Sequence, residues 1–483
     1  MIKLNEHPLY EQTEEDLEAF QVLFEGDQGK LKKEKYLWAH ELELKAKGGR
    51  IRALRETRSS YTNWAEVLVS IWTSVAFRRD PTIPPEVTDL LGEAIENIDG
   101  KGSSLISFIR EQVVQSMFVS GRPIIRVSSL GDKPATKAEE NAGKFWQPYF
   151  ELISPLAFKD WGFLSDTGVT HDKFAFCRLE YQELEDRASS KDAPVINTYS
   201  KEYSLNEGYL TVTKYKKTKS DKGEADYWEE VSVDELRDWD EIPIVAKFGE
   251  SWLKDVSPHL LKYYNTESVI DNIVLHQAHQ RIIFIGDIQG EDAMNLSETS
   301  INVLPSGSSV TVISPTDTSA IDNRLNKILS NIFRIGLNML KMQLDSAQVE
   351  SSDTLKQVKD GAIALIQAEI ESVETIVNEA IRLFAKYKGQ QDFTAGIKFN
   401  VDDLENSIDE AIKLISVFRD DVRDLPKLKK SLLNWFIDRF DLGDKEELKA
   451  EVEQMIDSQS RANQEDIRQQ LYQGLLDGSK NGQ

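Results

Sequence analysis

Two helical patterns with an apolar β-type insert between them organise the middle of the chain. Residues 258–281 read PHLLKYYNTESVIDNIVLHQAHQR, and residues 319–344 read SAIDNRLNKILSNIFRIGLNMLKMQL. The insert between them, residues 282–318, is expected to consist of short strands and turns, with β-type runs at 282–286, 301–307 and 310–313. A chain that leaves and re-enters one helical layer in this way must project the intervening segment from that layer.

The two helical patterns differ in how their polar residues are distributed. The first carries polar side chains on every side, which predicts a helix that bridges surfaces or packs against copies of itself rather than one inside the core of a single subunit. The second has one apolar face, made by Leu325, Ile328, Leu329, Ile332, Phe333, Gly336 and Leu340.

A polar break and a long helix follow the second pattern. Residues 345–353 interrupt the apolar period, and Ser352 or Asp353 can cap the next helix, which is expected to run to about residue 388. Its expected inward face consists of Leu355, Val358, Ala362, Leu365, Ile366, Val373, Ile376, Ala380 and Phe384.

The spacing of apolar residues differs between the segments on either side of this region. Residues 9–120 are expected to be mainly helical, with an apolar helical period at 64–75, a stop at 80–85 (DPTIPP), Ser103 or Ser104 as an N-cap, and Gly121 as the end. Residues 122–249 favour strands, and Cys177 is expected to be a buried small apolar residue in one of them. Residues 209–215 and 227–233 are expected to form a hairpin, joined by a charged turn at 216–224. Residues 401–483 begin as a further helical region and end in a polar tail. The predicted fold class is therefore α+β and mainly helical.

Charge and composition exclude several classes of protein. The 483 residues have a net charge of −24, with 40% hydrophobic and 29% charged residues, as in an ordinary folded protein. Such acidity disfavours a protein that binds nucleic acid tightly, because tight binding comes from Lys and Arg side chains that neutralise phosphates. It does not disfavour a protein that lets DNA pass, although solubility through self-repulsion would explain the charge equally simply. No apolar run reaches the length of about 20 residues that a membrane helix needs.

Familiar catalytic and metal-binding motifs are absent from the sequence. The chain has no phosphate-binding loop, no Gly-x-Ser-x-Gly elbow, no Cys-x-x-Cys and no His-Glu-x-x-His, so no catalytic residue and no cofactor is assigned. His276 and His279, with Asp271 and Glu267 one and two turns away, could reach one metal ion, but polar contacts between helices are the favoured interpretation. The acidic residues Asp402, Asp403 and Glu405 are interpreted as a helix start rather than a nuclease cluster.

Three further stretches point to a known family. Residues 75–81 (VAFRRDP) combine apolar, aromatic and basic residues at the end of an early helix. Residues 118–123 (FVSGRP) lie where a helix ends and a strand begins, and residues 242–245 (IPIV) form a strand before the first helical pattern. With these stretches, the order of segments from about Tyr61 to Ala450 resembles the portal proteins of tailed bacteriophages. The resemblance is to a group of portal-like phage proteins long catalogued as a family of unknown function.

The resemblance implies a specific division of the chain. Residues 1–257 would form the N-terminal helices and the β-rich wing. The remaining parts would be a stem helix at 258–281, the clip at 282–318, a second stem helix at 319–344, the tunnel loop at 345–353, the long wing helix at 354–400, and a small crown with the C-terminal tail at 401–483. The short C-terminal region departs from family members with a long barrel.

The resemblance also implies a function and partners. Portals are twelve-subunit rings at one capsid vertex in the virion, and they assemble in the host cytoplasm. They serve as the conduit for double-stranded DNA during packaging and ejection, without enzymatic activity or a cofactor. The implied partners are other copies of the chain, the terminase large subunit, a head-completion or adaptor protein, the major capsid and scaffold proteins, and the passing DNA, with no membrane.

Charged residues in two segments give candidate sites within this scheme. The clip carries acidic residues without Lys or Arg, and these would form a docking rim for a basic partner: Asp287, Glu291, Asp292 and Glu298. The tunnel loop carries Asp345, Glu350 and Asp353, which would repel and centre DNA in the channel. Flanking lysines could supply sparse, transient phosphate contacts: Lys341, Lys356 and Lys359. Ordinary solvation remains the alternative explanation for each set.

Two rival functions remain open at this level. A packaging-motor enzyme, either an ATPase or a nuclease, is disfavoured by the missing phosphate-binding loop. Another structural connector or capsid component would share the composition and the absence of catalytic motifs.

Overall fold

The computed structural model describes most of the chain up to residue 400. The described ranges are 2–33, 35–39, 43, 50–77, 79–130, 146–164, 173–184, 195–206, 208–218, 227–277, 281–285, 309–313, 319–336 and 352–400. They form an α+β fold with more residues in helices than in strands. The chain divides into two compact units, each described by itself: unit 1 contains residues 1–14, 68–251 and 336–483, and unit 2 contains residues 15–67 and 252–335.

The first helix of the chain places its residues 8–14 in unit 1, and the later helices of this unit begin with residues 68–76 of α5 (Trp64–Ala76). Helix α5 is followed, after the proline-rich stop, by α6 (Pro85–Leu91) and the 3₁₀ turn η1 (Gly92–Glu96). The next helix is continuous and consists of three segments: α7 (Leu105–Phe108), the π-helical stretch η2 (Ile109–Val114) and α8 (Gln115–Ser120). Ser104, rather than Ser103, caps it by accepting the Ser107 N–H.

Gly121 ends this helix as predicted, for two physical reasons. Its φ of 68° lies in the left-handed region that L side chains rarely adopt. A Cβ at this position would also lie 2.6 Å from the carbonyl oxygen of Gly249, whose N–H donates to the Gly121 carbonyl at 2.8 Å. A side chain at position 121 would therefore collide with the 249–250 backbone that this hydrogen bond holds.

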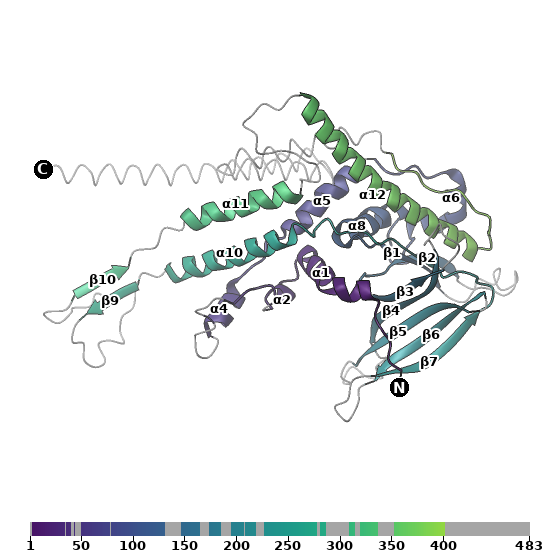
Figure 1. Cartoon of the computed structure of the whole chain (residues 1–483), viewed down its shortest axis with the longest axis horizontal. Helices are drawn as coiled ribbons and strands as arrows, with labels where there is room; N and C mark the ends of the chain where they lie inside the picture. Colours follow the sequence, from purple (N-terminus) through teal and green to yellow (C-terminus); the bar gives the residue numbers. More distant parts are fainter. Residues whose placement is uncertain are drawn as a thin grey trace. The chain divides into compact units, whose positions relative to one another are not determined.

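A three-stranded antiparallel sheet in unit 1 lies beneath the longest helix. Its strands are ordered β2 (Gln147–Leu152), β1 (Ile124–Leu130) and β8 (Ile244–Ala246). Helix α12 (Ser352–Tyr387) packs against all three strands (Figure 1). Its buried face includes Ile366, Val373, Ile376, Ala380 and Phe384, as the sequence predicted. Leu365 was also predicted to face inward, which is wrong, because its side chain is 45% exposed.

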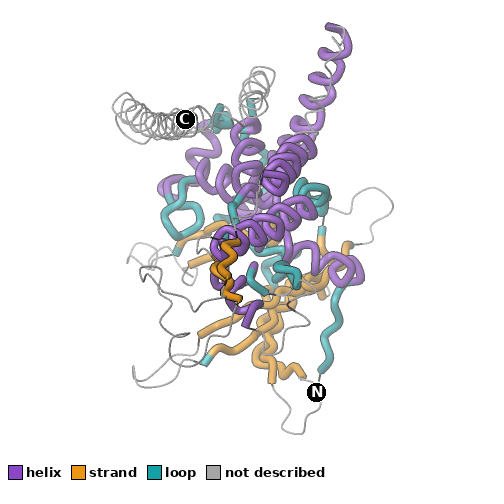
Figure 2. Tube along the Cα trace, turned by 90° about the vertical axis from the view of Figure 1, so that its left-hand side faces the viewer, coloured by secondary structure: helices purple, strands orange, loops and turns teal. Residues whose placement is uncertain are grey.

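A five-stranded antiparallel sheet completes unit 1, with neighbouring strands hydrogen-bonded in chain order (Figure 1); the strands are orange in Figure 2. They are β3 (Phe158–Phe163), β4 (Phe174–Leu184), β5 (Ile196–Asn206), β6 (Tyr209–Thr218) and β7 (Tyr227–Leu236). The predicted β6–β7 hairpin is confirmed, and β6 continues into residues 216–218 that were expected to be turn. Strands β2, β3 and β5 were not identified individually from the sequence.

The core of unit 1 joins the inner face of the five-stranded sheet to the smaller sheet. Phe158, Trp161 and Phe174 stack there with Phe248, and the ring centres of Trp161 and Phe248 are 4.6 Å apart. Cys177 is fully buried on β4, which confirms its prediction as a small apolar residue. Because burial also raises the pKa of its thiol, Cys177 stays in the unreactive protonated form.

Unit 2 contains most of the first predicted helical pattern and its insert. The elements lying wholly in it are α2 (Gln28–Leu31), α4 (Arg50–Arg58), α10 (Ser257–Gln277), β9 (Arg281–Ile285) and β10 (Ser309–Ile313). Helix α1 (Pro8–Glu25) contributes its residues from 15 onward, and α11 (Ser319–Gly336) all but its last residue. Strands β9 and β10 pair antiparallel between the two helices, as the β-type insert predicted (Figure 1). On α11, Ile328, Ile332 and Phe333 are buried, which confirms its apolar face.

Helix α10 differs from its prediction as a helix too polar for a core. Leu260, Tyr264, Asn265 and Ser268 are all buried within unit 2. Asn265 accepts the Trp38 N–H at 2.8 Å, and its Nδ2 donates to the Tyr36 carbonyl at 2.8 Å. Ser268 accepts from Arg55 Nη1 at 3.1 Å. The prediction failed because these polar side chains find their hydrogen-bond partners in other segments of the same unit.

Candidate functional site

Most of the charged residues singled out from the sequence lie outside the described residues. This applies to the clip residues Asp287, Glu291, Asp292 and Glu298 and to Asp345, Glu350 and Lys341. Asp353, Lys356 and Lys359 fall within α12, which begins at Ser352. The predicted tunnel loop therefore ends slightly before Asp353, and these three residues lie on the first turns of the long helix.

The residues on α10 that were weighed as metal ligands, with polar contacts favoured instead, are only partly described. The helix ends at Gln277, so His276 lies in its last turn and His279 lies outside the described residues, as do Asp402, Asp403 and Glu405. Burial raises the pKa of Glu267 to about 7, with Asp271 contributing and a Thr62 hydrogen bond opposing. A carboxylate with a raised pKa is favoured in its protonated form, which is a poor metal ligand.

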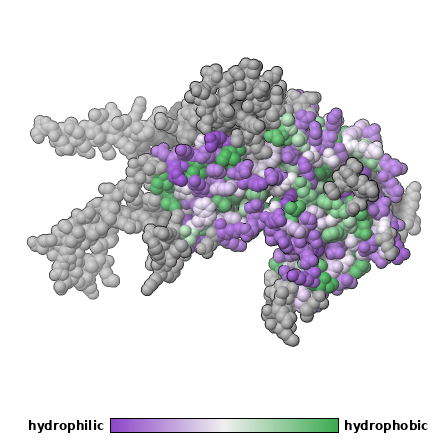
Figure 3. Space-filling view, in the orientation of Figure 1, coloured by the Kyte–Doolittle hydropathy of each residue, from purple (hydrophilic) through white to green (hydrophobic). Residues whose placement is uncertain are grey.

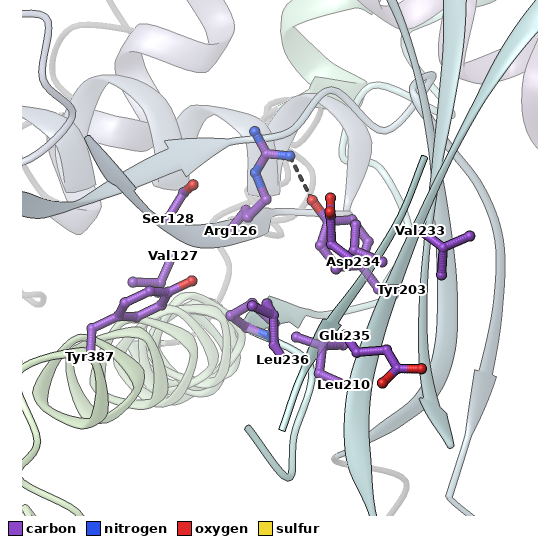
Figure 4. A pocket seen from close by; sticks show the side chains of 12 residues that line it. Arg126, Val127, Ser128, Tyr203, Leu210, Val233, Asp234, Glu235, Leu236 and Tyr387 are labelled. Atoms are coloured by element: carbon purple, nitrogen blue, oxygen red, sulfur yellow. Dashed lines mark hydrogen bonds between the residues drawn. The ribbon is translucent and has the colours of Figure 1, made fainter. Parts of the chain in front are cut away.

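A cavity in unit 1 brings together residues that are far apart in the sequence. This sheet cavity has a volume of about 510 Å³ and lies between β1, the inner face of the five-stranded sheet and the end of α12 (Figure 4). Its lining consists of Arg126, Val127, Ser128, Tyr203, Leu210, Val212, Val233, Asp234, Glu235, Leu236, Pro243 and Tyr387. The lining therefore combines apolar side chains with polar and charged ones.

Arg126 is the best-anchored charge of the sheet cavity. Its Nε donates to Glu151 Oε2 at 3.0 Å, and its Nη2 donates to the same oxygen. Its Nη1 donates to the Tyr203 hydroxyl at 2.9 Å (Figure 4). Burial opposes the charge of Arg126, but the interactions with Tyr203 and Glu151 outweigh it and raise its pKa. The guanidinium is thus a fixed positive charge at the wall of the cavity.

The other wall of the cavity is held by the end of α12. Tyr387 packs on Trp239 with ring centres 4.3 Å apart, and Lys386 bonds to both Asp240 and Glu241. Arg382 adds a bidentate contact to Glu241, with Nη1–Oε1 at 3.0 Å and Nη2–Oε2 at 2.6 Å. These contacts fix the end of the long helix to the segment between β7 and β8.

The side chains of the sheet cavity can form hydrogen bonds and charge contacts with a ligand. Its described lining offers an arginine, a serine hydroxyl, two tyrosine hydroxyls and two exposed carboxylates, with no histidine or cysteine to activate a nucleophile. Burial raises the pKa of both Tyr203 and Tyr387, so both phenols remain protonated. The site can therefore hold a ligand by hydrogen bonds and charge.

Sequence reasoning did not single out Arg126, Tyr203 or Tyr387. One available signal was the charge in the apolar run 123–127 (PIIRV), because a charged residue in a buried strand needs a partner. The partners themselves come from β2, β5 and α12, whose register only the folded chain defines.

Comparisons with known proteins add no identification. No protein-family model matches this chain, and no curated protein matches it. None of the helices that the structure describes is both long and apolar enough to cross a membrane. Within the same residues, no three His, Cys, Asp or Glu side chains gather in a way that could hold a metal ion.

Proposed function

We propose that this chain is the subunit of a portal ring that conducts double-stranded DNA through one vertex of a phage capsid. The observation that carries the proposal is the order of the elements: α10, the β9–β10 pair, α11 and then the long helix α12. A helix, a β projection and a returning helix are the order expected of a stem, a clip and a second stem helix.

The surroundings of α12 support the same proposal. In the portal scheme, the long helix after the tunnel loop belongs to a β-rich wing. Here α12 packs against β1, β2 and β8, and the five-stranded sheet lies in the same unit. Under this proposal the acidic residues of 282–318 form the docking rim, and those of 345–353 line the channel without gripping DNA.

Mass photometry and negative-stain microscopy of the purified full-length chain test the proposal. We expect closed rings of about twelve subunits, because a heterologous interface whose rotation closes generates a ring. A protein that stays monomeric or dimeric over a broad range of concentration and salt would contradict the proposal.

An ATP-hydrolysis assay separates the ring from the packaging-motor enzyme. We expect no hydrolysis above a buffer blank, with or without added DNA, since the sequence has no phosphate-binding loop. Steady turnover that follows the protein through purification would favour the enzyme instead. A ring without turnover that fails to bind terminase would favour a different structural connector.

A further inference from the structure

A row of lysines crosses the inner face of the five-stranded sheet beyond the sheet cavity. Lys201 on β5 lies directly opposite Lys214 on β6, and Lys216 follows two residues further on the same face, opposite Tyr199. We call Lys201, Lys214 and Lys216 the lysine lane. The chain as a whole has a net charge of −24, so these three lysines on one face of the sheet run against its overall charge.

In the absence of a ligand, repulsion between the lysines of the lane opposes folding. Like charges directly opposite each other on neighbouring strands repel, and Lys201 and Lys214 form such a pair. Burial lowers the pKa of Lys201, and the positive charges of Arg126 and Lys214 lower it further. Within the described residues, Lys214 has an ion pair with Glu183 at 3.1 Å, whereas Lys201 and Lys216 have none. A bound anion would relieve this repulsion.

Two tyrosine rings hold the lysines in place. Tyr181 and Tyr199 stack with their ring centres 6.0 Å apart, and Lys214 Nζ lies 4.0 Å from the centre of the Tyr199 ring. Lys201 Nζ lies 5.3 Å from the centre of Tyr181, and Lys216 Nζ 6.0 Å from that of Tyr199. Cation–π contacts of this kind orient an ammonium group while leaving its hydrogen-bond donors available.

The borders of the lane limit the shape of the anion. Glu183 on β4 flanks it on one side, and on β7 Glu229 faces Lys216 and Asp234 faces Val212. The positive surface is thus confined to two strands, which lie about 5 Å apart. A duplex presents phosphates on both sides of a groove about 12 Å wide and would meet these carboxylates, whereas one extended backbone fits between them.

The surroundings of the lysine side chains bear on what the row does. In the view of Figure 3, hydrophilic and hydrophobic residues are interspersed over the part of the surface that is coloured. The lysine side chains themselves are half-buried and lie beside the cavity wall at Arg126 and Tyr203. Lysines that served only for solubility would be expected to extend into water rather than over tyrosine rings.

We propose that the lysine lane binds the sugar–phosphate backbone of single-stranded nucleic acid, with Lys201, Lys214 and Lys216 each contacting a phosphate. The rings of Tyr181 and Tyr199 position the ammonium groups, and Arg126 extends the positive surface toward the sheet cavity. Recognition is independent of base sequence, because it involves only the backbone. The lane binds a strand whether or not the chain assembles into a ring.

Fluorescence anisotropy with a labelled 20-nucleotide oligo-dT and the full chain tests this binding. Three phosphate contacts give an expected slope of log K against log salt of about −2 for a single strand, so titrations span about 25 to 150 mM salt. The variant K201Q/K214Q/K216Q should lose at least about tenfold in affinity, and its salt slope should approach zero. The control K30Q/K35Q/K101Q removes three lysines outside the lane and should bind within about twofold of the original protein.

Several outcomes would overturn the proposal. They are no binding at the lowest salt, an equal loss in the control variant, tighter binding of a duplex of the same length, or full competition by polyglutamate, which would identify an acidic protein surface as the ligand. The variant K201R/K214R/K216R keeps the charge and should keep most of the binding. If the glutamine variant fails to fold by circular dichroism, K214Q alone should still flatten the salt slope by about 0.7, and an unchanged slope would contradict the proposal.

Discussion

The carboxylate of Glu241 receives both terminal nitrogens of Arg382, with Nη1–Oε1 at 3.0 Å and Nη2–Oε2 at 2.6 Å. Glu241 lies just before β8 and Arg382 near the end of α12, so this pair fixes the long helix to the connection between two sheets of the same unit. The Glu241 side chain is only 6% exposed, which places the pair where breaking it is costly.

Replacing Glu241 with glutamine should destabilise unit 1. E241Q removes the charge that faces Arg382 and Lys386 and should lower the free energy of unfolding by about 3 kcal/mol, measured by urea denaturation. The control E379Q removes the other, 39% exposed carboxylate at Arg382 and should cost less than about 1 kcal/mol. Equal losses in the two variants would contradict the assignment.

The same pair predicts a dependence on pH. Burial opposes the charge of Glu241, but the hydrogen bonds and charges of Arg382 and Lys386 lower its pKa from 4.5 to about 2. Because the folded pKa is the lower one, this stabilisation is complete above about pH 4.5 and is lost as the pH falls from 4.5 toward 2. The difference in unfolding free energy between the original protein and E241Q should therefore shrink between pH 6 and pH 3.

Asn265 should prove essential to the folding of unit 2. N265A leaves the Trp38 N–H and the Tyr36 carbonyl without their partner and should cost about 1–3 kcal/mol in unfolding free energy. The control T266A, at the next position on α10, removes only an exposed hydroxyl bonded to the Lys262 carbonyl and should cost less than about 1 kcal/mol. If thermal or urea unfolding shows N265A to be no worse than T266A, Asn265 is not the link between α10 and the 36–38 loop.

Ionisation of Glu267 should lower the free energy of unfolding of unit 2 as the pH rises. Its pKa in the folded chain is about 7 and its unperturbed value is 4.5, so the folded state binds the proton more tightly. Stability from this group is therefore greatest below about pH 4.5 and declines as the pH rises through 7. E267Q, which cannot ionise, should be similar to the original protein near pH 4.5 and more stable at pH 8.

Proton binding sets an upper limit on how much Glu267 can change the unfolding free energy with pH. One fully shifted proton gives about 1.4 kcal/mol per pH unit, and Glu267 should give less because it is partly exposed and bonded to Thr62. Paired urea titrations at four pH values would measure the difference. A constant difference between the two proteins across this range would contradict the raised pKa.

If residues 345–353 line the channel, changing their charge should alter the rate of DNA packaging. Replacing Asp345, Glu350 and Asp353 with lysine should leave ring assembly intact but slow packaging severalfold in a reconstituted reaction, because each lysine adds affinity for phosphate. The control E86K/D89K/E93K makes the same charge change at exposed positions on α6 and η1 and should package normally. Equal packaging rates for both variants at all salt concentrations would contradict a repulsive loop.

The sequence by itself determined those features that depend on neighbouring residues. The period of apolar residues located α5, α11 and α12, Ser104 and Gly121 marked helix ends, and alternation located the β6–β7 hairpin. These signals are local, because a helix or strand buries one face at a fixed spacing. The placement of Cys177 inside a strand was local in the same way.

Only the tertiary structure decided which polar residues are buried and what they contact. The sequence around Asn265 is typical of a surface helix, yet the 36–38 loop covers it and supplies its hydrogen bonds. Leu365 has the spacing of a core residue but remains exposed on α12. Lys201 and Lys214 are well separated in the chain and come to lie opposite each other only through the β5–β6 register, which depends on how the strands pair.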